Sequence, residues 1–285
     1  MRGRRFKTQE DIEKYIRQGC GQGEGVAYQP WIRVQDIPSR GRSRKVHGIK
    51  VDRVYHVLSD AEFLYLLLLE FSDKVVDIRE QFPIFPTEEA QRIAAELGIR
   101  YPRYHRTTLL FVMTTDFLIT YVDAQGKHHL AARTLKLDED LIDSTTLKRR
   151  LEKFELEKRI LASQGIEDWG IITPNIIGEI PAHNLKWLYA GVNIERQFDR
   201  AEIQHQFLES LQYFMHHERT LASLIRTAAK AMHLPYVDGV KLFKYLAWNK
   251  AIQFDIANHE LHMNQPCPSL QIVGLKKIST FLKAA

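Results

Sequence analysis

The residues best suited to chemistry in this chain are two carboxylates, Glu62 and Asp116, and a lysine, Lys136, which follows Thr134 by two positions. Carboxylate oxygens are the ligands that Mg²⁺ prefers, and a bound metal ion generates hydroxide from water and stabilises charge on a phosphate. A lysine beside such a site can orient the water or balance the charge that develops around phosphorus. If the fold brings these side chains together, they could carry out metal-dependent hydrolysis of a phosphodiester.

Asp116 and Lys136, with Thr134 between them in the sequence, belong to the segment 112–136, which predicts a β-hairpin. Its two halves alternate in polarity, and the turn-rich segment 123–127 between them contains a glycine. If the turn is centred on Gln125, Asp116 lies across from Thr134, and Lys136 shares a face with Thr134, diagonal to Asp116. A half-exposed ion pair between the strands is the structural alternative, and the hairpin alone is compatible with both.

Glu62 is predicted to lie in the first turn of a buried helix. Ser59 and Glu62 have the spacing of a capping box in front of the apolar segment 63–69, and we expect the helix to span about 60–71. The positive end of the helix dipole favours a carboxylate there, and a residue held in this turn can be a rigid metal ligand. Closing the helix cap is the purely structural role that Glu62 could have instead.

The elements predicted in the first 175 residues alternate between helices and strands around this hairpin, which indicates an α/β domain with a mixed sheet. A phosphate-binding loop requires a strand before it and a helix after it. The glycine-rich segment 19–25 has neither in the predicted pattern, so we interpret it as a flexible connector. The other predicted elements are a helix at 8–18, a strand at 75–78, a helix at 87–97, a helix at about 144–164 and a strand at 170–173.

The pattern becomes mostly helical from about residue 179. In the last predicted helix Val240, Phe243 and Leu246 face inward, which leaves Lys241 and Lys244 outside. Helices followed by a short strand suggest a winged-helix domain that could read a DNA groove, and a helical protein-docking domain fits the spacing equally well. We therefore divide the chain into domains 1–175 and 176–285. The helices are expected at 183–191, 199–215, 218–232 and 237–249, before a strand at 251–256.

The charge of the chain permits a polyanionic partner without requiring one, since the formal net charge is +5 over 285 residues. Within the segment 30–58, which we interpret as a loop, cations are dense enough to suggest contact with DNA phosphates, although a solvated basic loop is the alternative. The residues expected to bind DNA are Arg40, Arg42, Arg44, Lys45, Lys50 and Arg53.

Several other classes of protein are disfavoured. Cys20 and Cys267 match neither a metal spacing nor a disulfide framework, which favours a reducing compartment. The N-terminus lacks the apolar region of a secretory signal, and the longest apolar run is too short to cross a bilayer, so we expect a cytoplasmic protein. His259 and His262 stand three residues apart without a cysteine pair or a long helix, which argues against zinc.

Motifs along the first 175 residues, taken together and in order, resemble those of the TnsA family; the second half of the chain resembles it less distinctly. The motifs are Gly21-Gln22-Gly23-x-Gly25, Pro30-Trp31, Pro38-Ser39-x-Gly41-Arg42, Ser59-Asp60-x-Glu62, Asp77-Ile78-Arg79-Glu80-Gln81-Phe82-Pro83, Thr115-Asp116-Phe117-Leu118, Thr134-Leu135-Lys136 and Glu155-Leu156-Glu157.

The resemblance implies a restriction-endonuclease-like domain in a subunit of a heteromeric transposase. Such a subunit would cut the 5′, non-transferred strands at transposon ends with Mg²⁺, for which Mn²⁺ could substitute. A TnsB-like transposase would cut and join the 3′ ends, and a TnsC-like ATPase regulator would bind the C-terminal region. A stand-alone restriction or repair endonuclease of the same fold, and a non-catalytic DNA-bound adaptor that recruits the ATPase, are the alternatives.

The resemblance also implies roles for individual residues. By position, Glu62 and Asp116 correspond to the metal-binding carboxylates of the family and Lys136 to its catalytic lysine. The carbonyl of Leu135 could be a further ligand, and Glu157 is expected to support the site. Where the family usually has glutamine, this chain has Thr134, whose single hydroxyl cannot bridge two metal ions, so the number of ions stays open.

Overall fold

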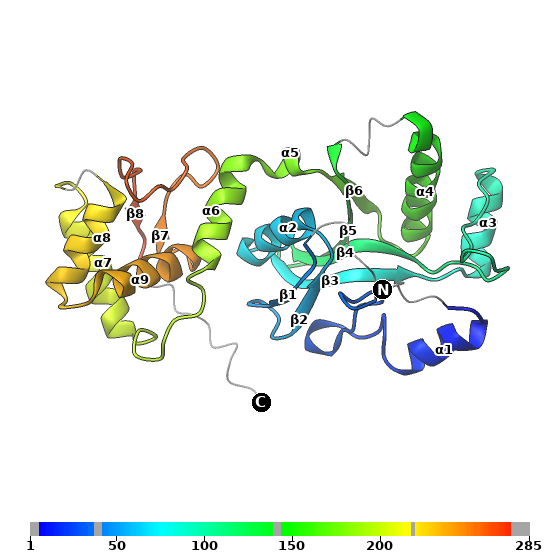
Figure 1. Cartoon of the computed structure of the whole chain (residues 1–285), viewed down its shortest axis with the longest axis horizontal. Helices are drawn as coiled ribbons and strands as arrows, with labels where there is room; N and C mark the ends of the chain where they lie inside the picture. The colour runs from blue at the N-terminus through cyan, green and yellow to red at the C-terminus, as the bar shows by residue number, and fades with distance from the viewer. Residues whose placement is uncertain (1–5, 37–41, 139–143, 218–219, 275–285) are drawn as a thin grey trace. The chain divides into compact units, whose positions relative to one another are not determined.

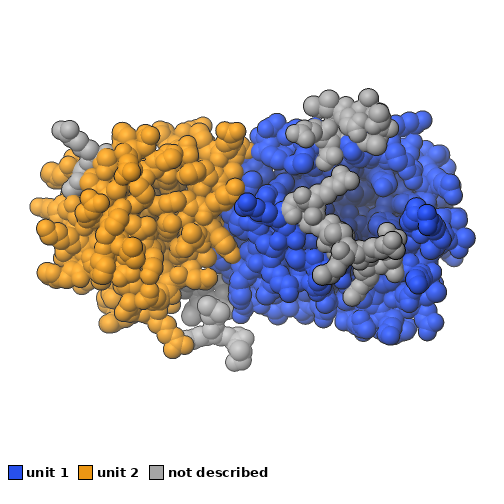
Figure 2. Space-filling model, in the orientation of Figure 1, with its two compact units in different colours: residues 1–177 blue, residues 178–285 orange. Residues whose placement is uncertain are grey.

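The computed structural model describes residues 6–36, 42–138, 144–217 and 220–274. The chain forms two compact units, residues 1–177 and residues 178–285, which are coloured separately in Figure 2. The boundary between them lies two residues beyond the division expected after residue 175. Among the described residues, no helix has both the length and the apolar character needed to span a membrane.

Unit 1 is built on a four-stranded mixed sheet whose strands follow the order β3-β4-β5-β6 (Figure 1). Strand β4 pairs antiparallel with both β3 and β5, and β6 runs parallel to β5. The predicted mixed α/β fold with a helical C-terminal region is therefore confirmed. The strands are β3 (Val75–Ile84), β4 (Met113–Val122), β5 (His128–Leu135) and β6 (Asp168–Ile172).

Four of the helices of unit 1 are α1 (Gln9–Arg17), α2 (Asp60–Phe71), α3 (Glu88–Glu96) and α4 (Ser144–Ser163). The hydroxyls of Thr8, Ser59 and Thr87 accept backbone N–H groups at the starts of the first three, and Ser59 is the helix cap named in the sequence analysis. Helices α3 and α4 pack on one face of the sheet in a common core with Leu118 and Ala132. Helix α2 packs on the other face, where the rings of Tyr65 and Phe117 lie 5.6 Å apart.

Strand β3 is ten residues long, whereas the sequence predicts only its first four, because its second half does not read as a strand. That half contains Glu80, Gln81 and Pro83. Glu80 is buried because the guanidinium of Arg53 binds both of its carboxylate oxygens. Proline has no N–H to donate, and Pro83 is tolerated because β3 lies at the edge of the four-stranded sheet.

The segment interpreted as a basic loop contains a second, smaller β-structure. Strands β1 (Arg44–His47) and β2 (Val54–Val57) pair antiparallel. Their inward side chains, among them Val46 and Tyr55, are buried. The loop interpretation overlooked the alternation of inward and outward side chains along these four-residue strands.

The glycine-rich segment 19–25 is also more ordered than the flexible connector that the sequence suggests. The N–H of Gly21 donates to the carbonyl of Gln29 at 2.6 Å, and a short 3₁₀ helix follows at Gly25–Ala27. The next residues run beside β3, where the hydroxyl of Tyr28 and the N–H of Trp31 donate to successive β3 carbonyls.

Unit 2 contains α6 (Glu179–Tyr189), α7 (Ala201–Phe214), α8 (Leu221–Ala231), α9 (Tyr236–Trp248), and the paired strands β7 (Ile252–Gln253) and β8 (Gln271–Ile272); α5 (Pro174–Ile177) ends unit 1. Among the described residues, α7, α8 and α9 precede the paired strands β7 and β8, and the winged-helix assignment stays a prediction. The inward face of α9 is formed by Leu242, Phe243 and Leu246, while Val240, predicted to face inward, is only half-buried. Lys241 forms ion pairs with Glu195 and Asp238.

Candidate active site

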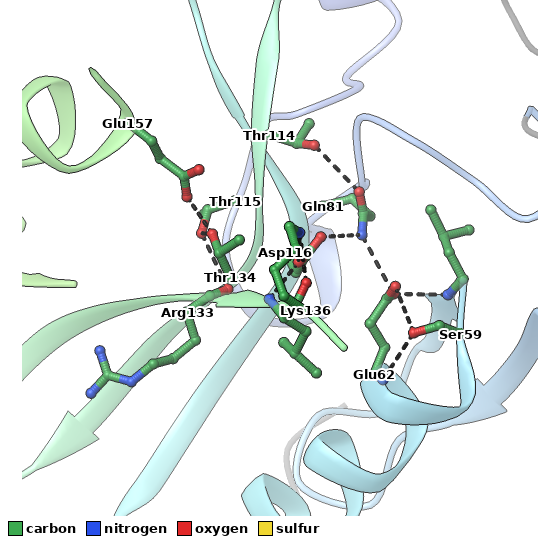
Figure 3. Close-up of polar contacts among 12 residues, drawn as sticks. Ser59, Glu62, Gln81, Thr114, Thr115, Asp116, Arg133, Thr134, Lys136 and Glu157 are labelled. Atoms are coloured by element: carbon green, nitrogen blue, oxygen red, sulfur yellow. Dashed lines mark hydrogen bonds and ion pairs between the residues drawn. The ribbon is translucent and has the colours of Figure 1, made fainter. Parts of the chain in front are cut away.

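The β4–β5 hairpin brings Asp116 and Lys136 together as the sequence predicts. Phe117 and Arg133 form the last pair of the ladder, and Asp116 and Thr134 are the next residues along the two chains. The ammonium of Lys136 lies 3.7 Å from Oδ2 of Asp116 and donates to the carbonyl of Leu135 at 2.6 Å (Figure 3). Asp116 therefore has a cationic neighbour, and the carbonyl expected to bind a metal ion is held by the lysine.

Asp116 also takes part in strand pairing, which the sequence does not reveal. Its Oδ2 accepts the backbone N–H of Leu135 at 2.7 Å, at the point where the ladder between β4 and β5 ends. Asp116 thus has a structural partner besides Lys136. Removing the whole side chain would leave the Leu135 N–H without this acceptor.

Glu62 is held at the first turn of α2 by three hydrogen bonds. Its Oε1 accepts the hydroxyl of Ser59 at 3.1 Å, and the Ser59 oxygen accepts the N–H of Glu62 at 3.1 Å. Its Oε2 accepts the N–H of Leu58 at 2.8 Å. The cap thus differs from the predicted box, in which the carboxylate would bind the N–H of Ser59 itself. Of the two oxygens, Oε2 also lies next to the amide of Gln81 (Figure 3).

The environment of Glu62 favours a cation. The side chain is buried, and burial together with the charge of Asp116 raises the pKa of Glu62 to about 8. A cation beside Glu62 would offset both effects that raise this pKa. It would compensate for the solvation lost on burial, and it would reduce the repulsion between the carboxylates of Glu62 and Asp116.

Gln81 joins the two carboxylates, and sequence reasoning assigned it no role. Its amide nitrogen lies 3.4 Å from Oε2 of Glu62 and 3.3 Å from Oδ1 of Asp116. Its amide oxygen accepts the hydroxyl of Thr114 at 3.4 Å. Figure 3 shows the amide between the carboxylates. Gln81 could have been found only from the β3–β4 register, in which the pairs Glu80–Phe117 and Phe82–Thr115 flank it opposite Asp116.

The donor set fits a hard divalent cation. Two carboxylates from different elements, Glu62 and Asp116, approach one point, and a neutral amide now occupies the space between them through contacts at the long end of the hydrogen-bond range. Oxygen ligands of this kind suit Mg²⁺ or Mn²⁺ and not a thiophilic metal. The carbonyl of Leu135, on the same hairpin, would complete the protein ligands.

Thr134 lies with Glu157 rather than with the carboxylate pair. Its hydroxyl donates to Oε1 of Glu157 at 2.5 Å, and the indole N–H of Trp169 donates to the same oxygen at 3.0 Å. Thr115 extends this group, since its hydroxyl lies 3.4 Å from that of Thr134 and donates to the carbonyl of Arg133. The hydroxyl of Thr134 therefore anchors β5 to α4.

Glu157 is buried, which raises the pKa of its carboxyl group. Its contacts from β4, β5 and β6 explain how it can support the site without reaching the reacting atoms: the strands that carry Asp116 and Lys136 are fixed through it.

The six residues expected to bind DNA lie in different environments. Arg40 lies outside the described residues, whereas Arg42 and Lys45 are exposed. Arg44 forms an ion pair with Asp60 and lies over the ring of Phe63, and Lys50 is half-buried.

Arg53 is not a DNA-binding residue. Its side chain is 6% exposed and its guanidinium holds Glu80. A cation closed off in this way cannot reach a phosphate, because its partner and the surrounding core exclude the ligand.

A second basic surface was missed because its residues are distant in sequence. Lys7 from the N-terminal segment and a loop around residue 105 line a hollow of about 540 Å³. The aromatic residues of the lining belong to a core cluster in which Phe6 and Tyr104 are buried, so the cations are the groups that could contact a nucleic-acid backbone. The lining residues are Phe6, Lys7, Arg103, Tyr104, His105, Arg106, Thr107 and Phe111.

Comparison with known proteins gives matches in both units. Residues 72–174 match the family model described as TnsA-like endonuclease N terminal, and residues 177–256 match the model described as TnsA endonuclease C terminal. The chain is 39% identical over 183 residues to "Transposon Tn7 transposition protein TnsA" of Escherichia coli. That alignment covers 64% of this chain and 63% of the relative, so the chain spans somewhat less than two thirds of the length of this relative.

Proposed function

Because this chain belongs to the TnsA endonuclease family, we propose that it is the endonuclease subunit of a Tn7-like heteromeric transposase and hydrolyses the 5′, non-transferred strands at transposon ends. The observation that carries the proposal is the convergence of Glu62 and Asp116 on the amide of Gln81, with the ammonium of Lys136 3.7 Å from Asp116. A half-exposed ion pair would need neither the buried second carboxylate nor the bridging amide.

Glu62, Asp116 and the carbonyl of Leu135 would hold Mg²⁺ or Mn²⁺. When bound, the ion supplies a nucleophilic hydroxide and stabilises the charge on the phosphate. Glu62 must lose its proton to become a ligand, so binding is favoured as the pH rises toward 8. Lys136 would leave the Leu135 carbonyl and turn its ammonium to the water or the phosphate oxygens.

Contacts to the DNA backbone are proposed for the exposed cations of unit 1, namely Arg42, Lys45 and the cations around the basic hollow. Unit 2 is proposed to dock on a TnsC-like ATPase regulator, and a TnsB-like transposase is proposed to cut and join the 3′ ends. On this view recognition of the transposon end comes from the partner.

The proposal is tested by cleavage of an end-labelled transposon-end duplex in Mg²⁺, with and without the cognate transposase. We expect 5′-strand cutting only in the assembled complex, and none with Asp116→Asn. Cutting of arbitrary duplexes by the protein alone would favour a stand-alone restriction or repair enzyme. Absence of cutting in both arms, while the transposase still cuts 3′ ends, would favour a non-catalytic adaptor.

A further inference from the structure

A group of side chains whose ligand atoms lie close enough to hold a metal ion is found in unit 2 and shares no residue with the site in unit 1. It consists of His183 on α6 and of Glu260 and His262 in the segment between β7 and β8. Oε1 of Glu260 lies 3.1 Å from Nδ1 of His183 and 3.1 Å from Nε2 of His262. One carboxylate oxygen thus stands between two imidazole nitrogens that come from distant parts of the sequence.

The spacing of these atoms is close to that of a tetrahedral site. Bonds of about 2.0–2.1 Å to Zn²⁺ put neighbouring ligand atoms about 3.3 Å apart in a tetrahedron. The two separations of 3.1 Å already satisfy this, and all three ligand atoms lie within 4.8 Å of one another. Only the two imidazoles must approach each other, which small rotations of partly exposed rings allow.

The backbone that carries these ligands is fixed from inside the unit by Asn184, which is fully buried. The Asn184 amide nitrogen donates to the carbonyls of Ile256 and His259 at 2.9 and 2.8 Å, and its oxygen accepts the N–H of Leu261 at 2.8 Å. Asn184 follows the first ligand directly, and Leu261 separates the other two. The anchor therefore adjoins every ligand, as expected where a protein orients metal-binding groups through supporting hydrogen bonds.

We propose that unit 2 binds a borderline transition-metal dication, Zn²⁺ first among them, through His183, Glu260 and His262, with water in the fourth position. Two imidazoles and one carboxylate suit Zn²⁺ and do not suit Mg²⁺, which requires oxygen ligands. The ion would join α6 to the segment between β7 and β8. The three side chains are 40–48% exposed, so an ion can enter and an ion pair alone would contribute little.

Two features explain why neither the spacing of residues in the sequence nor the family match reveals this site. His259, which forms the conspicuous pair with His262, contacts Asp255 instead, and the true partner, His183, lies 77 residues before Glu260. The family match ends at residue 256, so Glu260 and His262 lie beyond it.

The test is calorimetric titration of the full-length protein with Zn²⁺ in the presence of excess Mg²⁺, which occupies the carboxylates of unit 1. We expect one tight site in the wild type, weakened by at least about tenfold in His183→Ala and in Glu260→Gln. His259→Ala is the matched control, since it removes an imidazole from the same segment without touching the three ligands, and it should bind Zn²⁺ as the wild type does.

Glu260→Gln keeps the size and hydrogen-bonding capacity of the side chain, so it decides the question even if His183→Ala does not fold. Co²⁺ added to the wild type should give the intense visible bands of four-coordinate cobalt, and Zn²⁺ should raise the melting temperature of the wild type but not of Glu260→Gln. Equal Zn²⁺ affinity in the wild type and both ligand variants would overturn the proposal and leave a hydrogen-bonded triad.

Discussion

The raised pKa of Glu62 predicts that the metal-free protein loses stability as the pH rises. A glutamate whose folded-state pKa is about 8, against an ordinary value of 4.5, stays protonated in the folded chain while it ionises in the unfolded chain. The unfolded state therefore binds fewer protons between these two values, and the free energy of unfolding falls by about 1.4 kcal/mol per pH unit. From pH 5 to pH 7 the loss from this group is about 2–3 kcal/mol.

Glu62→Gln isolates this contribution, because the other buried carboxyls are present in both proteins and cancel in the difference. Urea unfolding in EDTA can be followed by the fluorescence of the tryptophans. Between pH 5 and pH 7, the free energy of unfolding of the variant should rise by about 2–3 kcal/mol relative to that of the wild type. Mg²⁺ should recover most of this difference at pH 8, since only the wild type binds it well and gains about 2.7 kcal/mol at a concentration 100 times the Kd. Parallel pH curves for the two proteins in EDTA would refute the argument.

The remaining predictions concern catalysis, DNA and the core. Asp116→Asn keeps an oxygen that can accept the Leu135 N–H. It should abolish 5′-strand cutting and leave 3′-end joining, so that cointegrates replace simple insertions. If this variant cut 5′ strands at the wild-type rate, the assignment of the site would be wrong. Lys136→Ala should keep Mg²⁺ affinity and lose cleavage rate in single-turnover assays, and lost affinity would contradict its assignment. Arg42→Ala with Lys45→Ala should reduce the log–log salt slope of DNA binding by about two units, and an unchanged slope would exclude both residues. Arg53→Ala should instead destabilise the protein by about 3–5 kcal/mol in urea unfolding, because Glu80 stays buried without its partner, and a stability within 1 kcal/mol of the wild type would contradict this.

Local signals were enough to predict much of the frame. The caps at Thr8, Ser59 and Thr87 fix where helices begin, because each hydroxyl serves N–H groups only three residues away. The hairpin register follows from alternation and loop length, which are also local. These features place Glu62 on a helix and Asp116 near Lys136 without any knowledge of the tertiary structure.

What sequence reasoning missed depends on contacts between distant segments. Arg53 resembles a surface cation until β2 is placed beside β3 and Glu80 closes on it. Thr134 occupies a position where a catalytic group is expected, yet its environment is decided by Glu157 on α4 and Trp169 on β6. A charge or hydroxyl in a short motif therefore says little about its role until the buried partner is known.

Gln81 shows how the fold holds the two carboxylates in position. Its φ of +49° is unusual for a residue with a side chain and costs of order 1–3 kcal/mol, so the surroundings must impose it. Two sets of contacts impose this backbone conformation. The guanidinium of Arg53 fixes the Glu80 carboxylate, and the carbonyls of Glu80 and Gln81 accept hydrogen bonds from Tyr28 and Trp31. The N-terminal segment thus holds β3 in the conformation that aims the Gln81 amide between Glu62 and Asp116. Because the carboxylates are already positioned, a cation that displaces the amide finds its ligands in place and need not organise them.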